Sequence, residues 1–175
     1  VNSSASGVAI YVKNTVPQSR VLLTSNLQAL AVRATMKGKT YVLTSIYVPP
    51  SFVPSVSDFD SFIHQLNSSA YFLNGDINAH SPYWGATRTC KRGEVAETVM
   101  DRYSLIPINV SDKTFWSRAH NTFSLVDLTL AHPSIFLDFQ YEVLSDLHTS
   151  DHYPIILDLT QDSTEGEKIP HFNFK

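Results

Sequence analysis

The chain has 175 residues, 43% of them hydrophobic, and a formal net charge of −3, which suits one compact domain and leaves too little chain for two. The negative charge argues against a protein that coats nucleic acid by bulk electrostatics, although local binding needs only a basic rim around a cleft. The single Cys90 excludes an internal disulfide, and no apolar stretch approaches the roughly 20 residues that span a bilayer, so neither a disulfide partner nor a membrane is expected.

The first third of the chain predicts antiparallel sheet followed by a helix. Residues 7–12, 30–35 and 40–48 are rich in β-branched and apolar side chains, and the turn residues 37–39 separate the last two runs. Residues 55–66 then place apolar side chains at the i, i+3, i+4, i+7 spacing of a helix, behind serine and aspartate capping candidates. We expect that helix to pack on a sheet face.

The rest of the chain alternates strands and helices. A buried strand at 71–73 leads into a polar stretch from 76 to 92, which is too long for a plain turn. Helices are predicted at 93–103 and 133–137. The further predicted strands are 105–110, 114–116, 126–130, 139–144 and 155–159. Residues 161–168 are polar and acidic and read as a flexible segment.

This order of elements predicts an α/β fold, a two-sheet sandwich with helical outer layers, in four layers α/β/β/α. We place one domain at residues 1–160 and a flexible exit at 161–175. Such a scaffold allows catalytic side chains to gather on the loops that follow strand ends.

Acidic and amide side chains stand at three of these predicted strand ends. Asp76 and Asn78 end one strand, Asp127 lies within another apolar strand, and Asp151 with His152 precedes a third. A carboxylate in an apolar strand is costly without a partner, and a histidine is its natural partner. Hydrolysis of a phosphodiester needs a positioned water, a group to take its proton and positive charge near phosphorus. These residues supply much of that set.

Together these runs resemble the endonuclease/exonuclease/phosphatase superfamily, and most closely the apurinic-type endonuclease domain of jockey-like non-LTR retrotransposons. The likeness extends from residue 7 to the end of the chain, and residues 79–85 resemble the retrotransposon subgroup in particular. The matching order of motifs is Tyr47, Asp76 with Asn78, Asp127, and Asp151 with His152.

The resemblance implies a role for each of these residues. Asp76 would orient or deprotonate the attacking water, Asn78 would bind the phosphate or hold Asp76, and Tyr47 would be directed at the phosphate. His152 would contact the phosphoryl oxygen and be held by Asp127, which would fix its tautomer and raise its pKa. Asp151 would sit near the metal or orient a water.

Metal and DNA contacts follow from the same resemblance. Mg2+ is the implied cofactor, with Mn2+ as an alternative, because the ligands are oxygen atoms, and Asp76 and Asp151 are the candidate metal ligands. A cluster of positive charge beside the expected cleft, Arg88, Lys91 and Arg92, is a candidate for contacts to DNA phosphates. We therefore expect a DNA endonuclease that nicks target DNA for retrotransposition.

The superfamily pattern opens with an Asn-bearing strand and a strand ending in a metal-binding Glu, and neither precedes residue 7 here. The resemblance therefore predicts an N-terminally truncated domain, lacking its first strands, that is a poor enzyme by itself. Residues 169–175 resemble the segment that leads toward a reverse transcriptase. The expected partners are DNA and a reverse transcriptase domain of the same parent polypeptide, at a nuclear or cytoplasmic, intracellular location.

Other interpretations stay open at this point. The motifs at 75–78 and 150–152, each taken alone, are a common turn and a common cap, whereas Asp127 is less easily explained because aspartate is disfavoured within a strand. It is the order of all the motifs that favours a catalytic site. The chain is alternatively a catalytically inactive DNA-binding remnant, or another phosphatase of the same superfamily. A calcineurin-like phosphatase fits less well, because no Asp-x-His motif precedes the Gly75-Asp76 pair and no Gly-Asn-His motif follows it. The histidines show no metal-ligand spacing, which argues against a zinc site.

Overall fold

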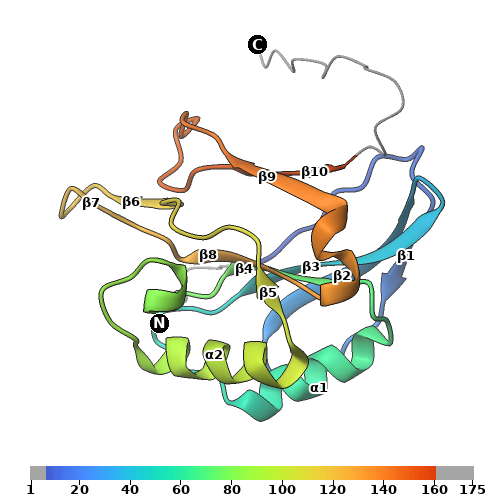
Figure 1. Cartoon of the computed structure of the whole chain (residues 1–175), viewed down its shortest axis with the longest axis horizontal. Coiled ribbons are helices and arrows are strands. Elements are labelled where there is room, and N and C mark those ends of the chain that lie inside the picture. The colour runs from blue at the N-terminus through green and yellow to red at the C-terminus, as the bar shows by residue number, and fades with distance from the viewer. Residues whose placement is uncertain (1–6, 161–175) are drawn as a thin grey trace.

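A mixed six-stranded sheet lies between two α-helices and a small two-stranded sheet (Figure 1). The computed structural model describes residues 7–160. The strands of the central sheet follow the order β1-β2-β3-β4-β8-β5. Their bounds are Gln18–Val21 (β1), Gln28–Met36 (β2), Lys39–Tyr47 (β3), Phe72–Asp76 (β4), Ile106–Pro107 (β5) and Asp127–Ala131 (β8).

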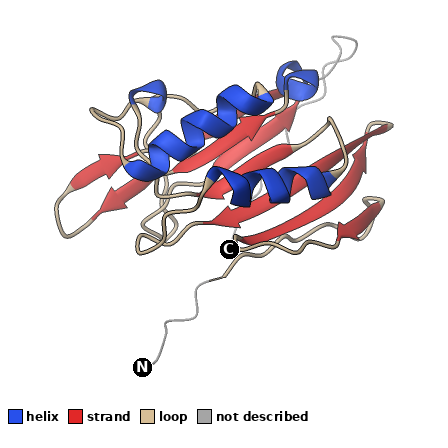
Figure 2. Ribbon diagram, turned by 90° about the horizontal axis from the view of Figure 1, so that it is seen from below, coloured by secondary structure: helices blue, strands red, loops and turns tan. Residues whose placement is uncertain are grey.

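Both α-helices of residues 7–160 cover one face of this sheet (Figure 2). Helix α1, Val56–Leu66, begins with a capping box in which Ser55 accepts from the backbone N–H of Asp58 and the Asp58 carboxylate accepts from that of Ser55. Helix α2 spans Lys91–Tyr103. The buried faces of both helices pack on the apolar side chains that β3, β4 and β8 direct to this side, and together they form the larger core.

The opposite face of the central sheet packs against the two-stranded sheet of β9, Phe139–Val143, and β10, Ile155–Leu159. A second, smaller core lies between them, built around Tyr41, Phe72 and Ile135. Tyr41 and Phe72 both make edge-to-face contacts with Phe139, at centroid distances of 5.2 and 4.8 Å. This packing fixes the position of the β9–β10 sheet, whose connecting loop precedes β10.

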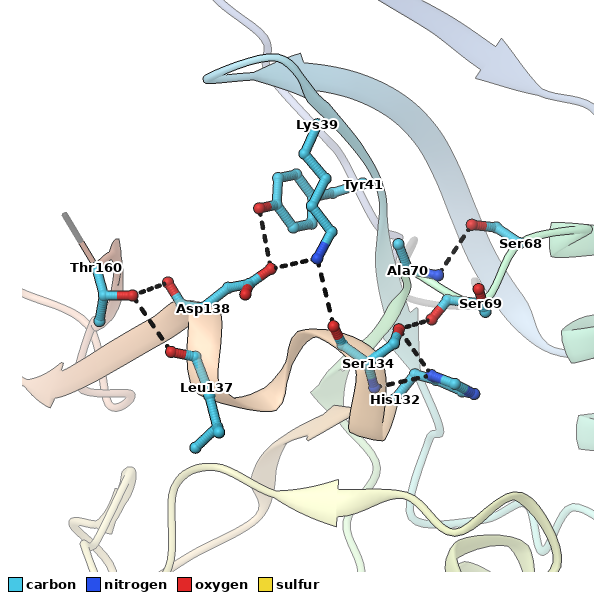
Figure 3. Close-up of polar contacts among 10 residues, drawn as sticks. All are labelled: Lys39, Tyr41, Ser68, Ser69, Ala70, His132, Ser134, Leu137, Asp138 and Thr160. Carbon is cyan, nitrogen blue, oxygen red and sulfur yellow. Dashed lines mark hydrogen bonds and ion pairs between the residues drawn. The ribbon is translucent and has the colours of Figure 1, made fainter. Parts of the chain in front are cut away.

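A polar cluster anchors one end of the β9–β10 sheet, as Figure 3 shows. The Asp138 carboxylate, at the end of the 3-10 helix η2 (Pro133–Asp138), accepts from the Lys39 ammonium at 2.7 Å and from the Tyr41 hydroxyl at 3.1 Å. The Thr160 hydroxyl, directly after β10, donates to the Asp138 carbonyl at 2.8 Å. Strand β3, the start of β9 and the end of β10 therefore meet at Asp138.

A short hairpin, β6 (Phe115–Ser117) and β7 (Thr122–Ser124), extends from the sheet beside the loop that precedes β10. Two backbone hydrogen bonds connect them. The Trp116 N–H donates to the Asp151 carbonyl at 2.8 Å, and the Tyr153 N–H donates to the Thr114 carbonyl at 2.7 Å. The Arg118 guanidinium also donates to the Ser150 carbonyl at 3.2 Å. The hairpin and this loop thus form one unit.

Two predicted strands are wrong. Residues 7–12 alternate exposed and half-buried side chains but pair with no strand among the described residues; the first strand is β1, Gln18–Val21. The predicted strand 105–110 is paired as a strand only at Ile106 and Pro107; one more backbone hydrogen bond follows at Ile108, and beyond it the Asn109 side chain replaces the backbone as the partner of β8. Strand β7 was not predicted at all, and α2 begins at Lys91 instead of residue 93.

The α/β sandwich class is confirmed, as are the helix that follows Ser55 and the remaining predicted strands, within a few residues at their ends. The predicted helix at 133–137 is the 3-10 helix η2. The proposed exit at 161–175 lies outside the described residues. Over residues 7–160, no helix is both long and apolar enough to cross a membrane.

Candidate active site

Tyr47, Asp76 and Asp127 form a row across three adjacent strands of the central sheet. Tyr47 ends β3 and is paired with Asp76, which ends the parallel strand β4. Asp76 is paired in turn with Asp127, the first residue of the antiparallel strand β8. Because paired residues on neighbouring strands lie side by side, the three residues form a row at one end of these strands. The expected convergence of these strand ends is therefore present.

His152 joins this row through Asp127. Its Nδ1 lies 2.8 Å from the Asp127 Oδ2, and since a carboxylate only accepts, Nδ1 carries the donated proton and Nε2 is left for a ligand. The imidazole packs against the Phe115 ring at a centroid distance of 4.9 Å, and the two residues form an isolated antiparallel bridge. The predicted contact between His152 and Asp127 is present.

The turn after β4 positions the Asp76 carboxylate through hydrogen bonds from Asn78. The Asn78 backbone N–H donates to Asp76 Oδ1 at 3.0 Å, and the Asn78 side-chain amide donates to Asp76 Oδ2 at 3.1 Å and to the Val48 carbonyl at 3.0 Å. Asn78 adopts a left-handed conformation with φ 47°, which asparagine tolerates better than most residues. In this geometry Asn78 holds Asp76, one of its two expected roles.

Gly75 is required for the close approach of β3 and β4 beside Asp76. It has φ 147°, and a Cβ at this position would lie 1.8 Å from the Ile46 carbonyl oxygen. Any larger residue would push β4 away from β3. The glycine in the Gly75-Asp76 motif therefore serves the pairing that brings Asp76 next to Tyr47.

Burial and neighbouring charges shift the pKa values of Asp76 and His152. Burial, and then the negative charge of Asp127, raise the pKa of Asp76 to about 6, although the two hydrogen bonds from Asn78 oppose the shift. The hydrogen bond to Asp127 raises the pKa of His152 above its ordinary value, against the effect of burial, with smaller contributions from Asp76 and Asp151. Two neighbouring groups with shifted pKa values are typical of a site for acid–base catalysis.

The other predicted site residues surround this row. Asp151 is exposed, and its charge reaches the His152 imidazole. Arg92 donates to the Asn78 carbonyl at 2.7 Å and to the Pro50 carbonyl at 2.9 Å, so its guanidinium supports the turn that holds Asp76. Arg88 and Lys91 are exposed, the first on the loop before α2 and the second at its start.

Metal-binding capacity in the described residues is limited to small sets of oxygen ligands. No group of three or more His, Cys, Asp or Glu side chains between residues 7 and 160 is placed to hold an ion. Asp76 and Asp151 nevertheless both lie close enough to His152 to raise its pKa. Two hard carboxylates of this kind suit a partly hydrated Mg2+, which usually keeps several waters, and do not suit a zinc cage.

Several supporting residues were not foreseen from the sequence. Thr114 is fully buried, and its hydroxyl accepts from the Asp127 N–H at 3.2 Å. Phe115 packs on His152, and Arg118 holds the loop that carries it. The sequence pattern at 114–116 indicates only a strand, because nothing in it tells which strand or loop lies alongside. Trp84, which lies in the run 79–85, is packed in the interior with no exposed surface.

Comparisons with known proteins agree with this geometry. Residues 41–156 match the model of a family described as endonuclease-reverse transcriptase (Exo_endo_phos_2). The chain is 29% identical over 161 residues to the RNA-directed DNA polymerase from mobile element jockey of Drosophila melanogaster, covering 88% of the chain and 17% of that protein. It is 29% identical over 175 residues to the probable RNA-directed DNA polymerase from transposon BS of Drosophila melanogaster, covering 97% of the chain and 19% of that protein. The chain thus spans less than a fifth of either relative.

One solved structure has the same fold. The endonuclease domain of TRAS1, a telomere-specific non-LTR retrotransposon, superposes with a TM-score of 0.68 at 22% sequence identity. The superposition covers 83% of this chain and 67% of that one.

Proposed function

The chain belongs to the endonuclease-reverse transcriptase family, as an endonuclease domain of the non-LTR retrotransposon type, and we propose that it is a metal-dependent DNA endonuclease that nicks target DNA for retrotransposition. The observation that carries this proposal is the row of Tyr47, Asp76 and Asp127 with His152 bonded to its end. Four residues from distant parts of the sequence meet at one end of the central strands, in an arrangement that suits attack on a phosphodiester.

Asp76 is the proposed base of the reaction. Its pKa of about 6 leaves it mostly ionised at neutral pH, while its burial keeps it basic enough to accept a proton from water. Asn78 fixes both carboxylate oxygens, so the direction in which Asp76 faces the attacking water is set before substrate binds.

His152 is the proposed electrophilic partner of the phosphate. With Nδ1 committed to Asp127, Nε2 is free to donate to a phosphoryl oxygen, and the raised pKa favours the protonated, positive form. Tyr47 lies next to Asp76 on β3, on the side away from Asp127, and its hydroxyl is a proposed second donor to the phosphate. A nick that primes reverse transcription must leave a 3′-hydroxyl, so water attacks phosphorus and the bond to the 3′-oxygen breaks.

Mg2+ would be held by Asp76 and Asp151, with waters and phosphate oxygens completing its coordination. When bound, it supplies positive charge that stabilises the negative charge developing on phosphorus and on the leaving oxygen. Mn2+ accepts the same oxygen ligands and is expected to substitute for Mg2+.

The wider setting follows from the relatives. Both are named RNA-directed DNA polymerases, so we propose that this domain acts in one polypeptide with a reverse transcriptase and cleaves DNA inside the cell. Arg88 and Lys91, both exposed where the chain enters α2, are the proposed contacts to the DNA backbone, whereas Arg92 supports the turn that holds Asp76.

A plasmid-nicking assay tests this function. Supercoiled DNA is incubated with the chain, and with a version extended upstream in its parent polypeptide, in Mg2+, Mn2+ or EDTA. We expect open-circular product with either metal and none in EDTA. His152→Ala should reduce the rate while Tyr41→Phe, at the distant Asp138 cluster, should not. Metal-independent nicking, or equal rates for His152→Ala and wild type, would contradict the proposal.

The alternative function is DNA binding without cleavage. It rests on the small number of carboxylates within reach of an ion, and the same samples decide it. Retarded DNA mobility without any nicking by either version of the protein would favour a catalytically inactive domain.

A further inference from the structure

Strand β8 lacks a complete neighbour on the side away from β4. Strand β5 pairs with it only at Ala131 and Leu130, and backbone pairing continues one step further, where the Ile108 N–H donates to the Thr129 carbonyl at 2.8 Å. Beyond that point the edge of β8 presents the N–H of Thr129 and both backbone groups of Asp127 without a strand to receive them. Buried backbone groups of this kind need partners.

The side chain of Asn109 takes the place of the missing strand. It has no exposed surface, its Nδ2 donates to the Asp127 carbonyl at 2.7 Å, and its Oδ1 accepts from the Thr129 N–H at 2.8 Å. A carboxamide carries the same donor and acceptor pair as a peptide group, so Asn109 forms the next rung of the ladder. The remaining group, the Asp127 N–H, donates to the buried Thr114 hydroxyl.

We propose that Asn109 is a positioning residue for Asp127 and, through it, for His152, an inference that rests on the proposed function. Asn109 makes no contact with His152 and lies on the opposite side of the Asp127 backbone from Asp76. Its effect is to fix where β8 begins. Because the Asp127 carboxylate holds the His152 imidazole at 2.8 Å, a shift of that backbone moves the imidazole away from the phosphate.

A purely structural role makes a different prediction. The larger core would loosen when any buried ladder-completing side chain is lost, and activity would follow stability alone. Thr44 offers a matched control, since it is also buried, donates to the Phe72 carbonyl at 2.9 Å and accepts from the Asn74 N–H at 3.1 Å. It completes polar contacts on β4 in the way that Asn109 does on β8, but does not touch Asp127.

The experiment compares Asn109→Leu, which keeps the size and removes both bonds, with Thr44→Val. At a temperature where both variants are folded, Asn109→Leu should lower kcat for plasmid nicking by on the order of 10²-fold with KM within about twofold, while Thr44→Val keeps both constants. Asn109→Ser, which leaves room for a bridging water, replaces Asn109→Leu if the leucine variant does not fold.

Proton NMR of the imidazole Nδ1–H provides the second readout at a fixed pH. The low-field resonance of His152, identified by its loss in His152→Ala, should shift or broaden in the Asn109 variant and stay unchanged in Thr44→Val. Wild-type kcat and an unchanged resonance in the Asn109 variant would overturn the proposal, as would equal changes in both variants. If the wild-type protein cleaves no DNA, the proposed function fails, but the NMR comparison still decides whether Asn109 positions the pair.

Discussion

The carboxylates near the two ends of the β9–β10 sheet differ in whether the protein supplies them with positively charged partners. At the end shown in Figure 3, the Asp138 carboxylate accepts from the Lys39 ammonium and the Tyr41 hydroxyl. At the other end, Asp76 is half-buried next to Asp127, and no described residue forms a salt bridge with Asp76. One end satisfies its charges within the protein. The other leaves negative charge that a bound cation or a protonated imidazole must balance, which is typical of a functional site.

The largest difference should come from His152→Ala. Removing the imidazole takes away positive charge at the phosphate, so nicking by the folded variant should fall on the order of 10²-fold or more. The rate of plasmid nicking and the thermal midpoint are measured together. A variant that nicks at the wild-type rate would remove His152 from the mechanism.

Asp76 should make the protein less stable as pH rises. Its pKa is about 6 in the folded state against 3.8 ordinarily, so the folded state binds more protons between these values, and the free energy of unfolding falls as pH rises from about 4 to about 6. Because Asp76 is partly exposed, we expect an effect on the order of 1 kcal/mol. Urea unfolding in EDTA across this range checks it.

Asp76→Asn sharpens this second prediction. The neutral amide should flatten the dependence on pH between 4 and 6 and should abolish nicking, so that stability and activity move in different directions. An unchanged pH slope in the variant would show that another group causes the dependence.

The smallest effect is expected at the opposite end of the sheet. Tyr41→Phe removes the hydroxyl that donates to Asp138 and should lower the free energy of unfolding by about 1 kcal/mol, since the hydrogen bond is to a charged group but partly exposed. Nicking by the folded variant should stay at the wild-type rate. A loss of nicking larger than the loss of folded protein would mean that the two ends of the sheet are coupled.

The fold was predictable where local pattern and long-range pairing agree. Ser55 and Asp58 form the capping box that the sequence of α1 suggests, and β10 has the bounds that its apolar run predicts. Residues 7–12 have the same alternation as a strand but no partner, because alternation describes the two faces of a segment and says nothing of what lies at its edges. The short strand β1 was missed since its side chains are mostly exposed.

The candidate site, like the fold, was predictable only in part. The order of Tyr47, Asp76, Asp127 and His152 along the chain led to the expectation that they meet, and the sheet register brings the first three side by side. The residues that hold them were not predictable. Asn109 acts as a rung of β8 through its side chain, a role that depends on β5 ending after two residues, and no local sequence pattern encodes that.

A double-mutant cycle in plasmid nicking tests most directly the claim that Asp127 and His152 work as one unit. Asp127→Asn, His152→Ala and the double variant are compared with wild type, and Tyr41→Phe combined with His152→Ala serves as the distant reference pair. In this account Asp127 reaches the phosphate only through the imidazole, and at a pH well above 6 Asp76 is ionised with or without the Asp127 charge. At such a pH the double variant should be about as slow as His152→Ala alone, whereas the reference pair should be additive. If the losses from Asp127→Asn and His152→Ala multiply as those of independent residues do, the central claim is wrong.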